Sequence, residues 1–331
     1  MTLHPPHLSN AQGALLGTLI GDAAGATLEF LGRIPTPDDL DHALTLPGGG
    51  VLCVAPGQIT DDGELTLALA RALCDAQEYP AEQVARHYQR WISSSPFDVG
   101  NATRMAMDCI GPGHTPVHVQ MTANARKHNL ESKANGALMR SSPLGIWAVR
   151  LNEREAVDAA RSDATLTHPN PTCQWANAAY VCALRHLIIF PGDAPGAFQA
   201  ALRALAEDQD ASAGAAEVRT WLQDAQTGQL PAFHPMAGFV RIGFTYAFFH
   251  LLAESTFEGA LRATLAGGGD TDTNACIVGG LIGALRGIEQ IPSRLIEGVL
   301  QCDTRLGHVR PDWLQPRDSM DLAIQLAGRS H

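Results

Sequence analysis

The chain has 331 residues and a formal net charge of −11, with 45% hydrophobic residues and seven cysteines. This acidic balance disfavours the broad basic surface that tracks nucleic-acid phosphates, so we expect no general nucleic-acid-binding surface. No apolar stretch reaches the roughly 20 residues of a membrane-spanning helix, and the N-terminal residues resemble no export signal. Because the cysteines are odd in number and form no C-x-x-C pair, we expect buried, reduced thiols and a cytoplasmic location. We also expect a monomer that makes no membrane contact.

Apolar residues recur three and four positions apart through most of the chain, which is typical of packed α-helices. In chain order, the segments with this spacing are Ala11–Phe30, Glu64–Gln77, Ala81–Ile92, Gly136–Val149, Cys173–Phe190, Met236–Leu252 and Ala275–Gly287. The run GVLCVAP at residues 50–56 has a composition typical of a short strand. The alanine-rich stretch Ala194–Gln229 predicts two surface helices. No loop is long enough to be a domain linker, so we predict a single compact all-α domain over residues 1–331.

The first helical segment carries a glycine at every fourth position: Gly13, Gly17, Gly21 and Gly25. One face of this helix therefore has no side chains, and a neighbouring backbone can approach it closely. Each glycine costs about 0.5–1 kcal/mol relative to alanine inside a helix. We favour tight helix packing over ligand access as the explanation of this pattern.

Two short acidic motifs each stand directly before an apolar helical segment. Their oxygen-bearing side chains are Thr60, Asp61, Asp62, Asp270, Asp272 and Thr273. Helix capping could explain either motif alone, since Asp61 with Glu64 fits a capping box and Asp270 or Thr271 could cap the second helix. Together the motifs form an all-oxygen donor set that suits Mg²⁺, Mn²⁺ or Ca²⁺ better than zinc. A shared pair of ions would neutralise the carboxylate repulsion, so the pattern indicates a dinuclear metal centre.

Six motifs, in their order and character, resemble the ADP-ribosylglycohydrolase family. They are GALLGTLIGDAAGATLEF, TDDGELTLALA, FDVGNATR, NGALMR, LTHPNP and GGGDTDTNACIVGGLIGA, and they extend from about Gln12 to Gly287. The resemblance implies a helical domain whose central cleft holds two Mg²⁺ or Mn²⁺ ions on the six side chains of the acidic motifs. It also implies a hydrolase that cleaves the glycosidic bond of an ADP-ribosylated protein and releases ADP-ribose.

The same resemblance implies catalytic and substrate-binding positions outside the acidic motifs. We assign Glu29 to positioning or deprotonating a water molecule and Asp98 to proton transfer, since each is an isolated acid. The implied substrate contacts are Asn101, Asn135, Gly136, His168, Gly268 and Gly269. Structural alternatives remain for three of these residues: a helix end for Glu29, an N-cap for Asp98 and a turn for His168.

The sequence departs from the family pattern at two places. Gly63 stands where many members have threonine, and we expect this change to affect the periphery of the site and not its ligands. In the segment SKANG, Ala134 replaces a glycine of the phosphate-binding loop, and the neighbouring Lys133 could compensate as a point charge.

The resemblance of the motif FDVGNATR to the family implies an arginine-linked substrate in preference to a serine-linked one. Two other classes of function remain open. Paired aspartates also serve metal-dependent phosphohydrolases, and some members of this family are non-catalytic proteins that bind a ligand or serve a structural role. Intact ADP-ribose as the product would distinguish a glycohydrolase from both.

Overall fold

The computed structural model describes residues 5–108, 115–208 and 212–328. Within these ranges it contains α-helices, short 3-10 helices and two isolated antiparallel bridges, but no strand. The predicted all-α fold is confirmed. The strand-like run at residues 50–56 forms a turn instead, in which Val54 bridges to Gly49.

The α-helices are α1 (Pro5–Ala26), α2 (Pro37–Ala43), α3 (Asp61–Leu73), α4 (Ala81–Ile92), α5 (Asn101–Met107), α6 (Val117–His128), α7 (Ser142–Trp147), α8 (Glu153–Thr167), α9 (Pro171–Ile189), α10 (Ala194–Ala206), α11 (Ala213–Thr227), α12 (Arg241–Leu252), α13 (Phe257–Leu265), α14 (Thr271–Arg286), α15 (Ser293–Leu300) and α16 (Ser319–Ala327). The 3-10 helices are η1 (Ala148–Arg150), η2 (Ile288–Gln290), η3 (Thr304–Leu306), η4 (Asp312–Leu314) and η5 (Pro316–Asp318).

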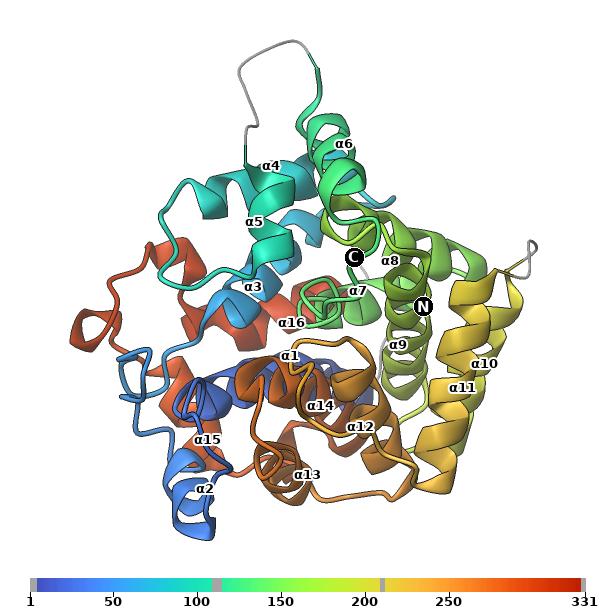
Figure 1. Cartoon of the computed structure of the whole chain (residues 1–331). Helices are drawn as coiled ribbons and strands as arrows, with labels where there is room; N and C mark the ends of the chain where they lie inside the picture. The colour runs from blue at the N-terminus through green and yellow to red at the C-terminus, as the bar shows by residue number, and fades with distance from the viewer. Residues whose placement is uncertain (1–4, 109–114, 209–211, 329–331) are drawn as a thin grey trace.

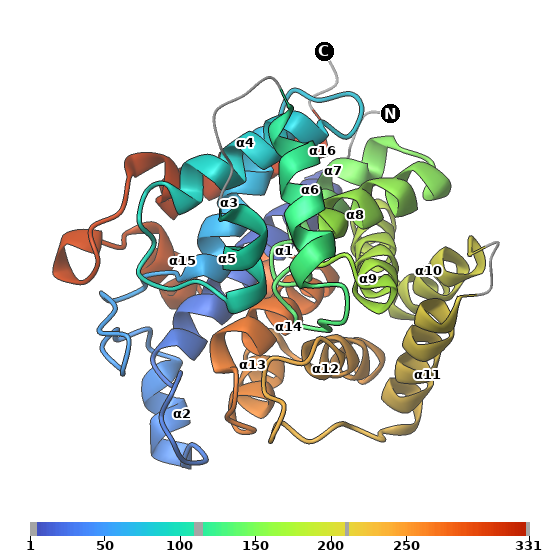
Figure 2. The ribbon, with the colours of Figure 1, turned by 45° about the horizontal axis from the view of Figure 1, so that its top comes forward.

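Helices α1 and α14 run side by side through the middle of the molecule (Figure 1). Both are buried on nearly every face, as expected for helices that are apolar all round. Helix α3 lies on one side of this pair, and α12 and α13 lie on the other (Figure 2). The two central helices therefore lie between α3 on one side and α12 and α13 on the other.

The glycine face of α1 allows this close packing. At each of its four glycines, a Cβ atom would lie 2.1–2.3 Å from a backbone atom of α14, at Gly283, Gly279, Ala275 and Asp272 in turn. Real Cβ atoms never approach a backbone so closely, so the two helices can cross here only because these positions lack side chains. The interpretation of the pattern as tight helix packing is confirmed. The contact extends to Asp272, which belongs to the second acidic motif.

The predicted helices differ from the observed ones mainly at their ends. Gly136–Val149 is helical only over α7 and the short η1, because residues 135–141 form turns. Helix α12 begins at Arg241, since the preceding residues are held in a loop by the bridge between Ala134 and Phe239. Helix α1 ends at Ala26, and Phe30 has a φ of 58°, outside the helical region.

The stretch Ala194–Gln229 forms the two predicted helices, α10 and α11, which lie side by side beyond α9 in both views (Figures 1 and 2). They are more than a surface layer, because Phe198, Trp221 and Leu222 are buried in the core. Part of the predicted turn between them, residues 209–211, lies outside the described residues.

No helix in the described part of the chain is both long and apolar enough to cross a membrane. Six cysteines are described, and all are free thiols. The exposed Cys53 differs from the expectation of burial, and Cys109 lies outside the described residues.

Replacing Gly17 by valine should destabilise the fold strongly. The new side chain would meet the carbonyl oxygen of Gly279, which cannot move without separating α1 from α14. We expect the free energy of unfolding, measured by urea titration, to fall by about 2–3 kcal/mol or more. The control is Gly100→Ala, at a glycine with a φ of −62°, where an added Cβ would have no neighbouring atom within 4 Å. Equal stability of the two variants would contradict the packing argument.

Candidate active site

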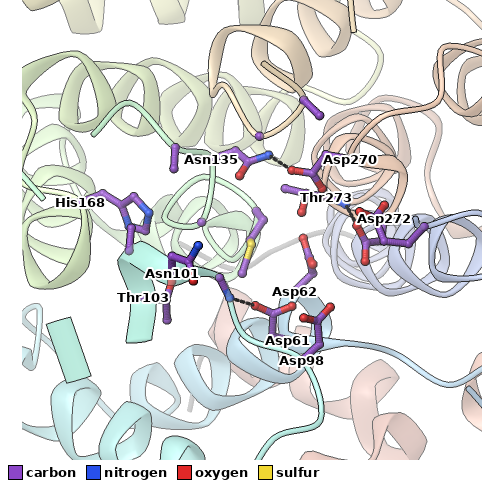
Figure 3. Close-up of a pocket in the computed structure, with 18 of the residues that line it drawn as sticks. Asp61, Asp62, Asp98, Asn101, Thr103, Asn135, His168, Asp270, Asp272 and Thr273 are labelled. Carbon is purple, nitrogen blue, oxygen red and sulfur yellow. Dashed lines mark hydrogen bonds between the residues drawn. The ribbon is translucent and has the colours of Figure 1, made fainter. Parts of the chain in front are cut away.

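A cleft of about 410 Å³ lies where the N-terminal ends of α3, α5 and α14 face one another. It brings together most of the predicted site residues: Glu29, Asp61, Asp62, Asp98, Asn101, Asn135, Gly136, His168, Asp270, Asp272 and Thr273. Figure 3 shows the acids on one side of the cleft and His168 with Asn101 on the other. Thr60 is buried behind this lining, and Gly268 and Gly269 line a neighbouring cavity.

Two groups of three carboxylates occupy the acidic side of the cleft. They are Asp22 with Asp62 and Asp272, and Glu29 with Asp270 and Asp272. In each group, one oxygen from every residue lies within 4.8 Å of the others. Asp272 belongs to both groups, as expected for a carboxylate that bridges two ions.

The donor set fits divalent cations that prefer oxygen ligands. All five members of the two groups are carboxylates, which suit Mg²⁺, Mn²⁺ or Ca²⁺. The Oδ1 atom of Asp62 is buried and accepts no hydrogen bond from the described residues. A buried carboxylate oxygen without a donor is rare in proteins, and a cation would supply the missing partner.

Asp22 was not among the predicted site residues. It lies in α1, is fully buried, and accepts hydrogen bonds from the backbone amide of Thr60 (3.0 Å), the Thr60 hydroxyl (2.9 Å) and the backbone amide of Gly63 (2.7 Å). The signal that could have found it is an acid in the otherwise apolar run GTLIGDAAG. A charged side chain on an interior helix requires a partner.

The predicted capping of α3 and α14 by their own acidic motifs is wrong. Thr60 and Asp270 occupy the N-cap positions of α3 and α14, and neither side chain makes a capping hydrogen bond. Asp22 instead accepts the amides at the start of α3. Glu29 caps α14, because its Oε2 accepts hydrogen bonds from the amide (2.7 Å) and hydroxyl (2.9 Å) of Thr271. Helix α1 and the turn after it thus provide both caps.

The clustered acids are held in conditions that disfavour their charge. Burial, followed by repulsion from neighbouring carboxylates, places the pKa values of Asp61, Asp62 and Asp272 well above the ordinary aspartate value. Burial also raises the pKa values of Asp22 and Glu29 to about 7. Cations bound between these groups would favour their ionised forms.

Asp98 lies in the loop between α4 and α5. Helix α5 begins at Asn101 with Gly100 at its N-cap, so the alternative of Asp98 as the N-cap is wrong. Burial raises the pKa of Asp98. The backbone amide of Gly100 donates a hydrogen bond to Oδ2 of Asp61 (3.2 Å), which joins this loop to the first acidic motif.

Asn135 and His168 form the polar, uncharged side of the cleft. The Asn135 side-chain amide donates to Oδ2 of Asp270 (2.8 Å), so this residue also touches the second acidic motif. The His168 ring lies against Gly136, where a Cβ would be only 2.9 Å from its Cε1. Burial lowers the pKa of His168 to about 3, so the imidazole is neutral at physiological pH. His168 is also the C-cap residue of α8, so it has a structural role in addition to lining the cleft.

A family model described as ADP-ribosylglycohydrolase matches residues 3–329. The chain belongs to this family. It is 30% identical over 285 residues to the ADP-ribosyl-[dinitrogen reductase] glycohydrolase of Rhodospirillum rubrum, covering 86% of this chain and 87% of that relative. It is 28% identical over 310 residues to the ADP-ribosylarginine hydrolase Tri1 of Pseudomonas putida (strain GB-1), covering 90% of this chain and 76% of the relative.

A solved structure of an ADP-ribosylglycohydrolase-related protein complex shares the fold, with a TM-score of 0.71 and 24% identity over 98% of this chain and 99% of that one. The family and these relatives make the chain a hydrolase that acts on glycosidic bonds. The resemblance inferred from the motifs is confirmed.

The two departures from the family pattern have different outcomes in the structure. The Gly63 amide binds Asp22, and a Cβ at this position would lie 2.6 Å from the Asp22 Oδ2 atom. This departure therefore touches a candidate metal ligand and not only the periphery. The expected role of Lys133 near a phosphate is wrong, because its Nζ is paired with Glu217 of α11 (2.7 Å).

Arg140 supports the loop that carries Asn135 and Gly136. Its side chain is fully buried and pairs with Asp163 (3.1 Å). Its Nη1 donates to the carbonyl oxygen of Gly136 (3.2 Å), and its guanidinium lies 4.5 Å from the centre of the Tyr88 ring. These contacts explain why the chain forms turns here and not the predicted helix.

A buried ion pair joins the first acidic motif to the loop of Asp98. Glu64, on α3, accepts hydrogen bonds from Nε (2.6 Å) and Nη2 (2.9 Å) of Arg310. Nη1 of Arg310 donates to the carbonyl oxygen of Ser94, at the start of that loop (3.0 Å). Arg310 thus holds the start of the loop that carries Asp98 against α3.

Metal binding should stabilise the protein. The stabilisation should be larger at high pH, because cations bind the ionised carboxylates and protons compete with them at low pH. Because their folded-state pKa values are raised, Asp22 and Glu29 hold more protons in the folded state than in the unfolded state between their ordinary values and about 7. The metal-free unfolding free energy should therefore fall as pH rises through this window. Mg²⁺ or Mn²⁺ at 100 times its dissociation constant should add about 2.7 kcal/mol.

The measurement is the melting temperature with EDTA or with added metal, at pH 5.5 and pH 8. Asp272→Asn should abolish most of the metal-induced increase, since Asp272 belongs to both carboxylate groups. Asp321→Asn, at an exposed position on α16, is the control. An undiminished increase in Asp272→Asn would rule out the shared-carboxylate centre.

Arg310→Gln should lower the free energy of unfolding by about 3–5 kcal/mol, because it leaves Glu64 buried without its cation. The comparison is Arg305→Gln, which removes an exposed ion pair with Asp303 and should leave stability almost unchanged. Chemical denaturation of the two variants measures the difference. Similar losses in both would show that the buried pair does not hold this region together.

Proposed function

We propose that residues 1–331 act as one ADP-ribosyl hydrolase domain that removes ADP-ribose from modified arginine side chains of proteins. The observation that carries this proposal is the pair of carboxylate groups that share Asp272 at one side of the cleft. Membership of the family supports the glycosidic bond as the target. The names of two relatives, an ADP-ribosylarginine hydrolase and a dinitrogen reductase glycohydrolase, support a protein substrate, and the first supports the arginine linkage.

The two ions, Mg²⁺ or Mn²⁺, would be held by Asp62, Asp270 and Asp272, with Asp22 and Glu29 beside them. Thr60, Asp61 and Thr273 complete the set that the family resemblance implies. When bound, such ions act as Lewis acids that fix the ribose hydroxyls and activate a water molecule. The carboxylates contribute by holding the sugar end of the substrate at one place in the cleft.

Two acids would move the protons of the hydrolysis. Glu29 lies among the carboxylate groups, and ions bound there would keep it ionised, so it is suited to take a proton from the attacking water. Asp98, whose pKa is raised by burial, would give a proton to the leaving nitrogen as its bond to the anomeric carbon breaks. The products are then ADP-ribose and the unmodified acceptor.

The uncharged side of the cleft would hold the rest of the nucleotide. Asn101, Asn135, Gly136 and His168 line it and offer amide groups, a backbone and a neutral imidazole. Their hydrogen bonds can orient the second half of ADP-ribose without adding charge. We assign the ribose to Asn101 and the diphosphate to the turn of Asn135 and Gly136.

The direct test is the product formed from ADP-ribosyl-arginine, ADP-ribosyl-serine and ADP-ribosylated nucleic acid in the presence of Mg²⁺ or Mn²⁺. We expect intact ADP-ribose, released fastest from the arginine substrate. Asp98→Asn should reduce kcat by about 10²–10⁴-fold, the usual contribution of a proton-transfer group. Asp321→Asn is again the control.

The alternative functions give different products in the same assay. AMP would identify a phosphohydrolase, and no product together with bound ADP-ribose would identify a non-catalytic relative. Faster release from serine or nucleic acid would retain the hydrolase and overturn the arginine assignment.

A further inference from the structure

A second cavity of about 490 Å³ adjoins the acidic side of the cleft. Its walls come from residues 28–34 after α1, from the loop at residues 234–237 and from the turn before α14. Glu29, Phe30 and Ala237 line both cavities, so the second one continues directly from the first. We call this second cavity the acceptor groove.

We propose that the acceptor groove binds the polypeptide segment that carries the ADP-ribosyl group, with an apolar side chain next to the modified residue. This inference rests on the proposed function. The bond to be cleaved would lie at the carboxylate groups, and a protein acceptor is far too large for a cleft of about 410 Å³. The acceptor must therefore leave the cleft beside the carboxylates, and the groove begins there, at Glu29.

The chemistry of the groove favours an apolar occupant. Phe30 and Ile34 are 60% and 67% exposed, although residues of this size are usually buried. The groove's cation, Arg33, is neutralised by two hydrogen bonds to Asp39, at 2.6 and 2.9 Å. Apart from Glu29 at its inner end, the groove thus presents no uncompensated acid or Arg charge to a bound peptide.

The backbone holds Phe30 at the boundary of the two cavities. Its φ of 58° is a conformation that bulky residues rarely adopt, and it fixes the direction of the chain where the two cavities meet. Gly268 and Gly269, which the family resemblance implies are substrate contacts, also have positive φ values and line the groove. Their place fits a contact with the acceptor better than one with the nucleotide.

The test compares Ile34→Ser with the unaltered protein on two substrates. One is free ADP-ribosyl-arginine, and the other is an ADP-ribosyl-arginine peptide with leucine next to the modified residue. Ile34 lines the groove and not the cleft, so we expect the ratio of kcat/KM for the peptide to kcat/KM for the free substrate to fall about tenfold, mainly through KM. Ile34→Leu should restore the ratio. Leu306→Ser, at a residue 72% exposed and outside both cavities, is the matched control.

An unchanged ratio in Ile34→Ser, or an equal fall in Leu306→Ser, would overturn the acceptor groove. A peptide with serine in place of the leucine should be a poorer substrate of the unaltered protein by a similar factor, and equal use of both peptides would also count against the proposal. Failure of the proposed function looks different, because neither the free substrate nor any peptide would then release ADP-ribose.

Discussion

The distance between α1 and α14 determines the geometry of the whole site. Four glycines of α1 face the α14 backbone, and the last of them, Gly25, faces Asp272 itself. The spacing of the two helices therefore also sets the spacing between Asp272 and the acids that α1 and its following turn provide, Asp22 and Glu29. A methyl group at any of these glycines would separate the helices, and close-packed interiors cannot absorb such a change locally. Dinuclear centres need their ligands placed to within a fraction of an ångström, so a contact between two backbones is well suited to set this distance.

The acids of the site have two different roles: some bind the amides at the helix starts, and others line the cleft. Asp22 accepts the amides of Thr60 and Gly63 at the start of α3, and Glu29 accepts the first amide of α14. Of the acids at the helix starts, Asp272 binds one amide, that of Thr273 (2.8 Å). The acids at those starts can therefore point into the cleft, where the helix dipoles also favour negative charge. This arrangement costs stability without cations, as the raised pKa values show. Functional sites commonly retain such unfavourable interactions, and the large core around α1, α9 and α14 offsets them.

Much of this arrangement could be predicted from the sequence, and the failures have physical reasons. Local patterns identified both acidic motifs, the glycine face and both ends of α4. Helices α2 and α8 were not predicted, because apolar spacing did not indicate them and the capping boxes at Thr36 and Asn152 that begin them were not recognised. Asp22 was missed because its partners lie 38 and 41 positions away in the sequence. The turns at residues 135–141 and the pairing of Lys133 depend on Arg140, Asp163 and Glu217, which only the folded chain brings near.

The charges of the cleft imply an order of binding. Within the described residues, no lysine or arginine lines the cleft, whereas Glu29, Asp61, Asp62, Asp98, Asp270 and Asp272 do. The nearby Arg140 is buried behind Gly136 and is already paired with Asp163. His168 contributes no charge, since burial keeps its pKa low. A diphosphate entering this cleft before the cations would find hydrogen-bonding groups but no positive charge, and the ionised carboxylates would repel it. This repulsion strengthens as the cleft loses water. Under the proposed function, we therefore expect the ions to bind before the nucleotide and to supply the positive charge that the described lining of the cleft lacks.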